Sequence, residues 1–338
     1  MRQGAHFAAM DATPTTAPLP VGDVLAAHPL LAGALAVFAF LHLVCAGLTV
    51  GGVLFTLVYQ LRGLAVRDYD LLARDVAGPL IVLMNLAALT GVVEIMLGTT
   101  LYPVPFYDGS SPIGSVWPLL LPPLAAAFAV TWLHQQSWDA LARHKGLHLT
   151  LIATAAVLFL AVQLIYVTGL DAALQGGGQP LRFAAAVLLP GVLPHFLHLV
   201  LASLTLSAVF LMRVVGSSAY DVTGRFRALS RTEIKTQLAS VALATLALQV
   251  LAGPLLYVAG AGVHDLRYHL AIGLGVLFAL PALHWLWKEV TVPTRGPGQR
   301  YGYIAGTLAL ALMFMVVARQ LTHAAHFAPA VAAVPAAH

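Results

Sequence analysis

Two histidines occupy the same position in a pentapeptide, Phe-Leu-His-Leu-Val, which occurs once around His42 and once around His198. Over residues 40–55 and 196–211 the two copies share nine identities in sixteen positions. The shared histidine, alanine, threonine and valine follow at helical spacing, so each segment predicts a helix with one imidazole above a strip of small side chains. An imidazole can bind iron and small residues let a flat ring lie close, and this combination favours haem as the ligand.

The composition requires a lipid environment for these helices. Of the 338 residues, 60% are hydrophobic and only 9% are charged, which excludes an ordinary soluble domain. A helix needs roughly 20 apolar residues to cross the hydrocarbon core of a bilayer. Eight stretches of that kind are predicted, near residues 34–60, 77–102, 115–138, 148–170, 187–213, 236–259, 267–288 and 302–322.

The repeat extends beyond the histidine helices. Similar residues recur at offsets of 150 to 155 positions, namely Glu94 and Gln249, Gly98 and Gly253, Leu101-Tyr102 and Leu256-Tyr257, and His134 and His284. We therefore predict an all-α polytopic membrane protein of two tandem four-helix units, residues 28–175 and 176–323. Four crossings return the chain to its starting side, so both units take the same orientation. The Ala- and Pro-rich tails, residues 1–27 on the outer side and 324–338, are predicted to lack fixed structure.

The basic residues predict the orientation. Four of the 17 Lys and Arg residues fall in the termini and even-numbered loops (Arg2, Arg182, Arg267 and Arg319), and thirteen fall in the odd-numbered loops. Positive residues stay cytoplasmic, so we expect both termini on the periplasmic side of a bacterial inner (cytoplasmic) membrane. Anionic lipid explains the net charge of +4, and nucleic acid is not an expected partner. A single cysteine, Cys45, excludes an internal disulfide, a c-type haem attachment and a cysteine-ligated cluster within this chain.

Helical rise indicates which ligands lie at the same depth. Counting along the predicted helices places His42, His198, Glu94 and His269 at a similar height near the outer interface. We predict His198 and His269 as the axial pair of one b-type haem, with Arg267 close enough to pair with a propionate. His42 is predicted to bind a second haem, although the third helix has no histidine that matches His269. The alternative is that these histidines are satisfied by neighbouring helices.

Glu94 is the only acidic residue predicted well inside a span, and three interpretations remain open. It could accept a proton during quinol chemistry, ligate or flank the haem of His42, or hydrogen-bond across helices. His134 and His284 lie about 15 residues, roughly 22 Å, from the level of His269 and cannot share its haem. The favoured interpretation of both is a boundary side chain that reaches the interface, although His134 could instead meet His144 or His148.

At this point the residues resemble subunit I of the cytochrome bd quinol oxidases. That family has a haem-ligating histidine near the outer end of its first helix and another on its fifth, and His42 and His198 match these positions. The run Thr-Gly-Val-Val-Glu-Ile-Met-Leu-Gly-Thr at residues 90–99 is similar to a segment of the family's second helix. Its glutamate, which lies by the active haem in the family, is Glu94 here. Trp138-Asp139-Ala140-Leu141 resembles the end of the family's third helix.

The chain also departs from the family's pattern. His269 falls near the place of a methionine ligand, so the resemblance implies a bis-histidine site in place of a His–Met one. No second acid lies near Ala127, and the long quinol-binding loop has shrunk to about residues 260–266. A Gly-Arg-Gln-Pro-Trp segment and a ninth helix with its glutamate ligand are both missing.

The leading hypothesis is a haem-b electron-transfer subunit of a respiratory complex. It would hold one or two haems and exchange electrons between quinol or quinone and an outer-side redox protein, such as a c-type cytochrome, beside other membrane subunits. The first alternative is a reduced bd-type quinol:oxygen oxidoreductase subunit. The second is a haem-free transporter or membrane anchor, for which broken helices at Gly253-Pro254 and Pro281 would be expected.

Overall fold

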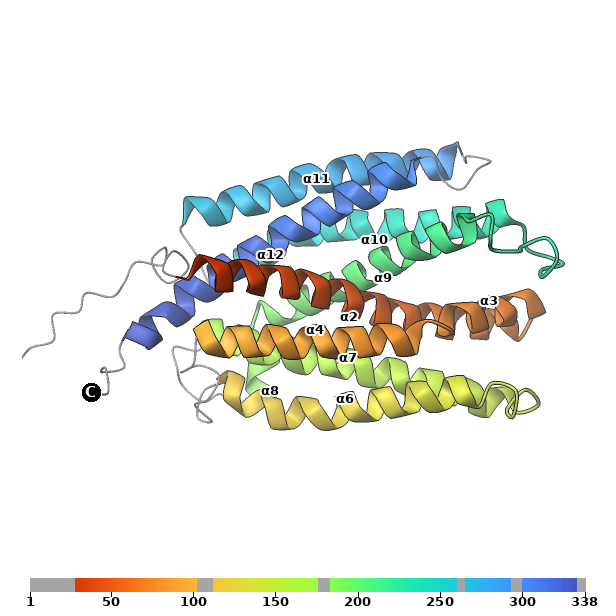
Figure 1. The fold of residues 1–338 in the computed structure, drawn as a ribbon, viewed down its shortest axis with the longest axis horizontal. Coiled ribbons are helices and arrows are strands. Elements are labelled where there is room, and N and C mark those ends of the chain that lie inside the picture. Colours follow the sequence, from red (N-terminus) through yellow and green to blue (C-terminus); the bar gives the residue numbers. More distant parts are fainter. Residues whose placement is uncertain (1–27, 102–111, 176–182, 260–264, 293–299, 333–338) are drawn as a thin grey trace, which may run out of the picture.

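The computed structural model describes residues 28–101, 112–175, 183–259, 265–292 and 300–332, which form helices and no strand (Figure 1). The helices are α2 (Pro29–Gly63), α3 (Arg67–Ala77), α4 (Leu80–Leu101), α6 (Pro112–Gln136), α7 (Lys145–Gln175), α8 (Phe183–Ala186), α9 (Val192–Gly216), α10 (Arg231–Ala259), α11 (Leu266–Thr291) and α12 (Tyr301–Ala332). The predicted all-α architecture is confirmed for this part of the chain. The predicted tail at residues 1–27 and most of the shortened loop at 260–266 lie outside the described residues.

Seven segments of the described chain are long and apolar enough to cross a membrane: α2, the continuous stretch of α3 and α4, α7, α9, α10, α11 and α12. A multi-pass membrane protein is thus confirmed. The remaining long helix, α6, has 25 residues and is not among these seven segments. The eighth span stays a prediction.

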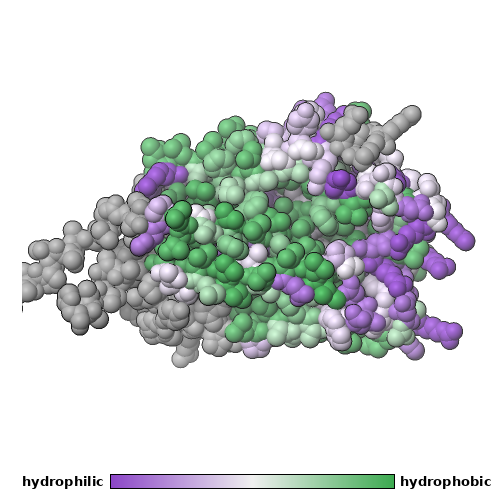
Figure 2. Space-filling model, viewed as in Figure 1, coloured by the Kyte–Doolittle hydropathy of each residue, from purple (hydrophilic) through white to green (hydrophobic). Residues whose placement is uncertain are grey.

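The two ends of the helical bundle differ in polarity. Figure 2 shows hydrophobic side chains over the middle of the visible face and hydrophilic ones gathered at one end. We call this the basic end; it holds the turns at residues 64–66, 137–144 and 217–230. Ion pairs tie it together, namely Arg74 with Asp139, Lys145 with Asp70, and Arg225 with Asp75. The opposite end, where α2 begins and α12 ends, is called the terminal end (Figure 1).

The two histidine helices, α2 and α9, pack directly against each other in the centre of the fold. Small residues allow this approach, because a Cβ atom on Gly51 would lie 2.2 Å from the backbone oxygen of Ser203. Gly47 faces the same helix, and a Cβ atom there would lie 3.1 Å from a methyl group of Leu206. Part of the small-residue strip therefore serves helix packing, as in other membrane bundles. Around this centre α2 packs with α4, α9 with α10, α6 with α7, and α11 with α12.

Two elements differ from the sequence-based expectation. Helix α3 was expected as loop, but its apolar side is buried through Leu72, Ala73 and Val76, and Asp68 near its start is only 6% exposed. The carboxylate of Asp68 accepts three backbone N–H groups of the α9–α10 loop. At the other end, α12 runs to Ala332 rather than stopping before residue 324, and Ala324 is fully buried. The high helix propensity of alanine favours this extension over an unstructured tail.

Candidate functional site

His42 lies on α2 with its ring against α4. Its Nδ1 atom is 2.9 Å from the backbone oxygen of Ala87. A carbonyl oxygen only accepts, so Nδ1 carries the proton and Nε2 keeps its lone pair. Gly91 makes room for the ring, since a Cβ atom there would lie 2.7 Å from Nδ1 and Cε1 of His42. An imidazole oriented through its second nitrogen in this way is typical of metal-binding histidines.

His198, on α9, has a different environment. Its Nδ1 atom is buried and has no hydrogen-bond partner among the described residues. Leaving a buried polar atom unpaired costs about 1–3 kcal/mol, so such an atom indicates that a group is missing from its surroundings. The residue as a whole is only half-buried, and the ring is thus reachable by a bound ligand. His42 is therefore oriented as an iron ligand, whereas His198 offers an unpaired ring nitrogen without that orienting hydrogen bond.

His269 and Arg267 each hydrogen-bond to a residue nearby in the sequence. Nδ1 of His269 is 3.1 Å from the hydroxyl of Tyr257 on α10, which again leaves Nε2 available. Arg267 binds Asp265, the residue that caps α11, and 56% of its side chain is exposed. The hydrogen bonds from Arg267 lower the pKa of Asp265. Arg267 is thus held at the surface by a carboxylate at the start of its own helix.

The structure does not bring His198 and His269 into contact. In the described part of the chain no hydrogen bond or ring contact joins them, and their helices, α9 and α11, are not among the pairs that pack closely. Helix α10 packs against both. The shared axial site stays a prediction, as do the roles of His42, Glu94 and Arg267.

Glu94, on α4, hydrogen-bonds across helices. Its Oε1 atom accepts from Arg319 of α12 at 2.7 Å, and the same guanidinium donates to the hydroxyl of Tyr166 on α7 at 2.5 Å. The Glu94 side chain is 12% exposed. Arg319 was assigned to the terminal region in the cation count, but it lies within a long apolar helix and is paired there. No pattern in the sequence indicated that the side chains of Glu94 and Arg319 contact each other.

Another buried acid, Asp171, lies beside this group. Asp171, which sits one residue beyond the predicted end of its span, falls inside α7 and is only 5% exposed. Its Oδ1 atom is 3.4 Å from Nδ1 of His195 on α9. Glu94 was predicted as the only acid well inside a span; Asp171 lies four residues before the end of its helix and is nevertheless buried. The signal that could have found this pair is the spacing of His195 and His198, which places both on one helix face.

His134 is not a boundary side chain, because it is fully buried. Its ring stacks on that of His148 with 4.1 Å between centroids, and Gln60 joins the two imidazoles. The alternative contact with His148 is thus present. His284, its counterpart in the repeat, is exposed as expected and packs edge-on against Trp285. No cluster of three or more His, Cys, Asp or Glu side chains with metal-binding geometry occurs among the described residues.

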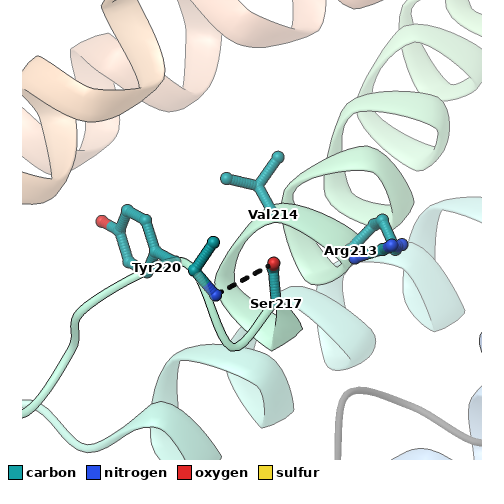
Figure 3. Close-up of a pocket in the computed structure, with 5 residues that line it drawn as sticks. Arg213, Val214, Ser217 and Tyr220 are labelled. Carbon is teal, nitrogen blue, oxygen red and sulfur yellow. Dashed lines mark hydrogen bonds between the residues drawn. The ribbon is translucent and has the colours of Figure 1, made fainter.

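A pocket opens at the basic end. It has a volume of about 370 Å³ and is lined by Arg213, Val214, Ser217, Ala219 and Tyr220. Figure 3 shows the Ser217 hydroxyl turned into the loop, where it accepts the backbone N–H of Ala219 at 3.3 Å. Fifteen residues of α9, about 22 Å of helical rise, separate Arg213 from His198. The pocket is thus separate from the histidines at the terminal end.

Comparisons with known proteins agree with this fold. No protein-family model and no curated protein matches the sequence. Among solved structures, a chain of the bd oxidase from Geobacillus thermodenitrificans superposes with a TM-score of 0.66 at 13% sequence identity. The match covers 88% of this chain and 87% of that chain. The resemblance to bd oxidases seen in the residues therefore extends to the fold of nearly the whole chain.

Proposed function

We propose that this protein is a haem-b-binding electron-transfer subunit of a respiratory membrane complex. It exchanges electrons between quinol or quinone in the bilayer and a redox protein, such as a c-type cytochrome, on the periplasmic side. The observation that carries the proposal is the pair of available imidazoles on the two repeated helices. His42 is oriented through Nδ1 with Nε2 left available, and His198 has a buried Nδ1 without a partner.

In this proposal His42 and His198 each hold one iron-porphyrin, and the bound group supplies reversible one-electron redox chemistry. The protein contributes burial and fixed charge. Gly91 gives the imidazole of His42 its place beside α4, and the ion pair of Glu94 with Arg319 lies one turn further along the same helix. His269 is the proposed second ligand for the haem of His198, and Arg267 the proposed partner of a propionate.

The membrane arrangement is part of the proposal. Helix α6 packs along α7 and is the proposed eighth span, which places both termini on one side of the bacterial inner membrane. The two four-helix units then correspond to α2–α7 and α9–α12. Further membrane subunits and lipid cover the apolar outer surface seen in Figure 2.

Two rival functions make different demands on the structure. The fold shared with a bd oxidase favours the quinol:oxygen oxidoreductase as second candidate. In that reaction Glu94 would serve as a proton carrier, whereas here it is bound to Arg319. The transporter alternative expected broken helices at Pro254 and Pro281. Both prolines lie inside continuous helices, so this feature does not support it.

A reduced-minus-oxidised visible spectrum of the purified protein, followed by haem extraction, tests the proposal. We expect a b-type spectrum. His198→Ala and His269→Ala should each remove the same low-spin component, because the loss of either ligand leaves iron five-coordinate and loosely held. His284→Ala is the matched control, since this exposed histidine should leave every component unchanged. A protein without haem would refute the function, and a silent His269→Ala would refute only the pairing.

A further inference from the structure

The pair formed by Asp171 and His195 has no role in the function proposed so far. Asp171 is 5% exposed, and its Oδ2 atom is buried without a hydrogen-bond partner among the described residues. Its other oxygen, Oδ1, lies 3.4 Å from Nδ1 of His195. A buried carboxylate oxygen without a donor is costly, so a donor from a ligand at this place would be favourable.

The hydrogen-bond roles follow from the atoms involved. An ionised carboxylate only accepts, so Nδ1 of His195 carries the proton and Nε2 presents a lone pair. The His195 side chain is 21% exposed, which makes it reachable from outside the bundle. On either side of it along α9, Leu193 and Leu197 are 61% and 45% exposed. The pair therefore offers one reachable acceptor, Nε2 of His195, and directly behind the pair one buried acceptor, Oδ2 of Asp171, beside an apolar surface.

We propose that Asp171 and His195 bind the hydroxyl groups of a quinol that enters from the bilayer, and that His195 accepts its protons. The proposal rests on the quinol-linked function above and adds the place of the substrate. The hydroxyls of a quinol are donors and match two acceptors, whereas the oxygens of a quinone only accept. The site therefore discriminates between the two oxidation states and holds the reduced form more tightly.

Oxidation of one quinol to quinone releases two protons and two electrons, in two one-electron steps. In each step one O–H bond breaks and its proton passes to Nε2 of His195. The electron would pass to the oxidised haem iron that His198 would hold, three residues or about 4.5 Å of rise further along α9, and the outer-side redox protein would reoxidise that iron before the second step. The imidazolium then gives its proton to water at the terminal end before the next step.

The surrounding charges suit this role. Arg319 faces the region from α12, but Glu94 already balances its charge. The other titratable groups near the pair are Tyr166 on α7, His323 and His326 on α12, and His198 on α9. A proton on His195 would thus form a neutral pair with Asp171. This arrangement stabilises an imidazolium without a new unpaired charge.

Equilibrium binding of a short-chain benzoquinol and of the matching benzoquinone to the purified protein, without oxygen, tests the proposal. We expect the wild-type protein to bind the quinol at least about tenfold more tightly, the effect of one charge-assisted hydrogen bond. His195→Ala and Asp171→Asn should each lose this preference while the quinone affinity stays the same. His326→Ala is the control, because that ring bonds to the oxygen of Thr322 in its own helix.

His195→Gln is a second variant at this position. It keeps a polar side chain of similar size, so it is expected to fold even if His195→Ala does not. This variant should lose the quinol preference while its unfolding temperature stays that of the wild-type protein. Equal binding of both forms by the wild-type protein, or an unchanged preference in the folded variants, would overturn the proposal. A protein that prefers quinol but holds no haem would instead overturn only the electron-transfer function.

Discussion

Replacing Gly91 with alanine would place a methyl group in the position that the His42 ring occupies. The new Cβ atom would lie 2.7 Å from the ring, whereas ordinary contact begins near 3.4 Å. The ring must therefore move by 3.4 − 2.7 = 0.7 Å or the helices must separate. Movement of the ring disturbs the 2.9 Å hydrogen bond to Ala87. Overpacking of this kind costs about 1–3 kcal/mol, and the loss of the hydrogen bond adds about 1 kcal/mol.

The assay is the haem content and visible spectrum of Gly91→Ala, measured with the thermal unfolding of the same sample. We expect the component bound by His42 to be lost or shifted while the component bound by His198 remains. Unfolding should occur at a lower temperature than in the wild-type protein, because the strain acts whether or not haem is bound.

Gly253→Ala provides the matched control, because a Cβ atom there meets nothing within 4 Å. Alanine is the better helix former by about 1 kcal/mol, so this variant should be as stable as the wild-type protein or more stable. An unchanged spectrum and unfolding temperature in Gly91→Ala would show that His42 does not sit against α4 as described. Equal losses in both variants would show that the effect is not specific to the ring.

Asp68→Ala should lower the free energy of unfolding by about 3 kcal/mol, because three backbone N–H groups lose a charged acceptor. Denaturation in detergent measures this loss, and Asp139→Ala, which removes an exposed ion pair, should cost at most about 1 kcal/mol. Reporter fusions after Arg67 and Arg227 should both read cytoplasmic, since both lie at the basic end; a split result would refute the predicted orientation.

The sequence alone predicted those helices whose sequence pattern lies within the helix itself. Except at the end of α12, apolar length predicted the boundaries of the long helices within about five residues, because lipid requires runs of that length whatever the helices pack against. The repeat around His42 and His198 predicted two similar helices, and these are the ones that meet at the centre of the fold. Helix α3 was missed because it is short and polar overall, and its burial depends on the loop that covers Asp68.

Contacts between distant segments could not be predicted in the same way. Glu94 and Arg319 are separated by 225 residues, and only the path of α12 across the bundle brings them together. Asp171 fell outside its predicted span, which ended at residue 170, whereas α7 continues to Gln175. Helix boundaries are the part of a helix that sequence patterns define least well. Because Asp171 was not assigned to a helix, its burial and its contact with His195 were not predicted.

One pair of positions in the predicted repeat, Glu94 and Gln249, has different partners in the structure. Glu94 takes Arg319 as its partner, whereas its counterpart Gln249 donates to the hydroxyl of Thr205 at 3.0 Å. A carboxylate inside a membrane bundle needs a cation, while an amide is satisfied by a hydroxyl. Only the first of these two positions is therefore charged, and it lies one turn from Gly91 and the ring of His42. The charged member of the repeat thus stands beside the proposed redox group of the first unit alone.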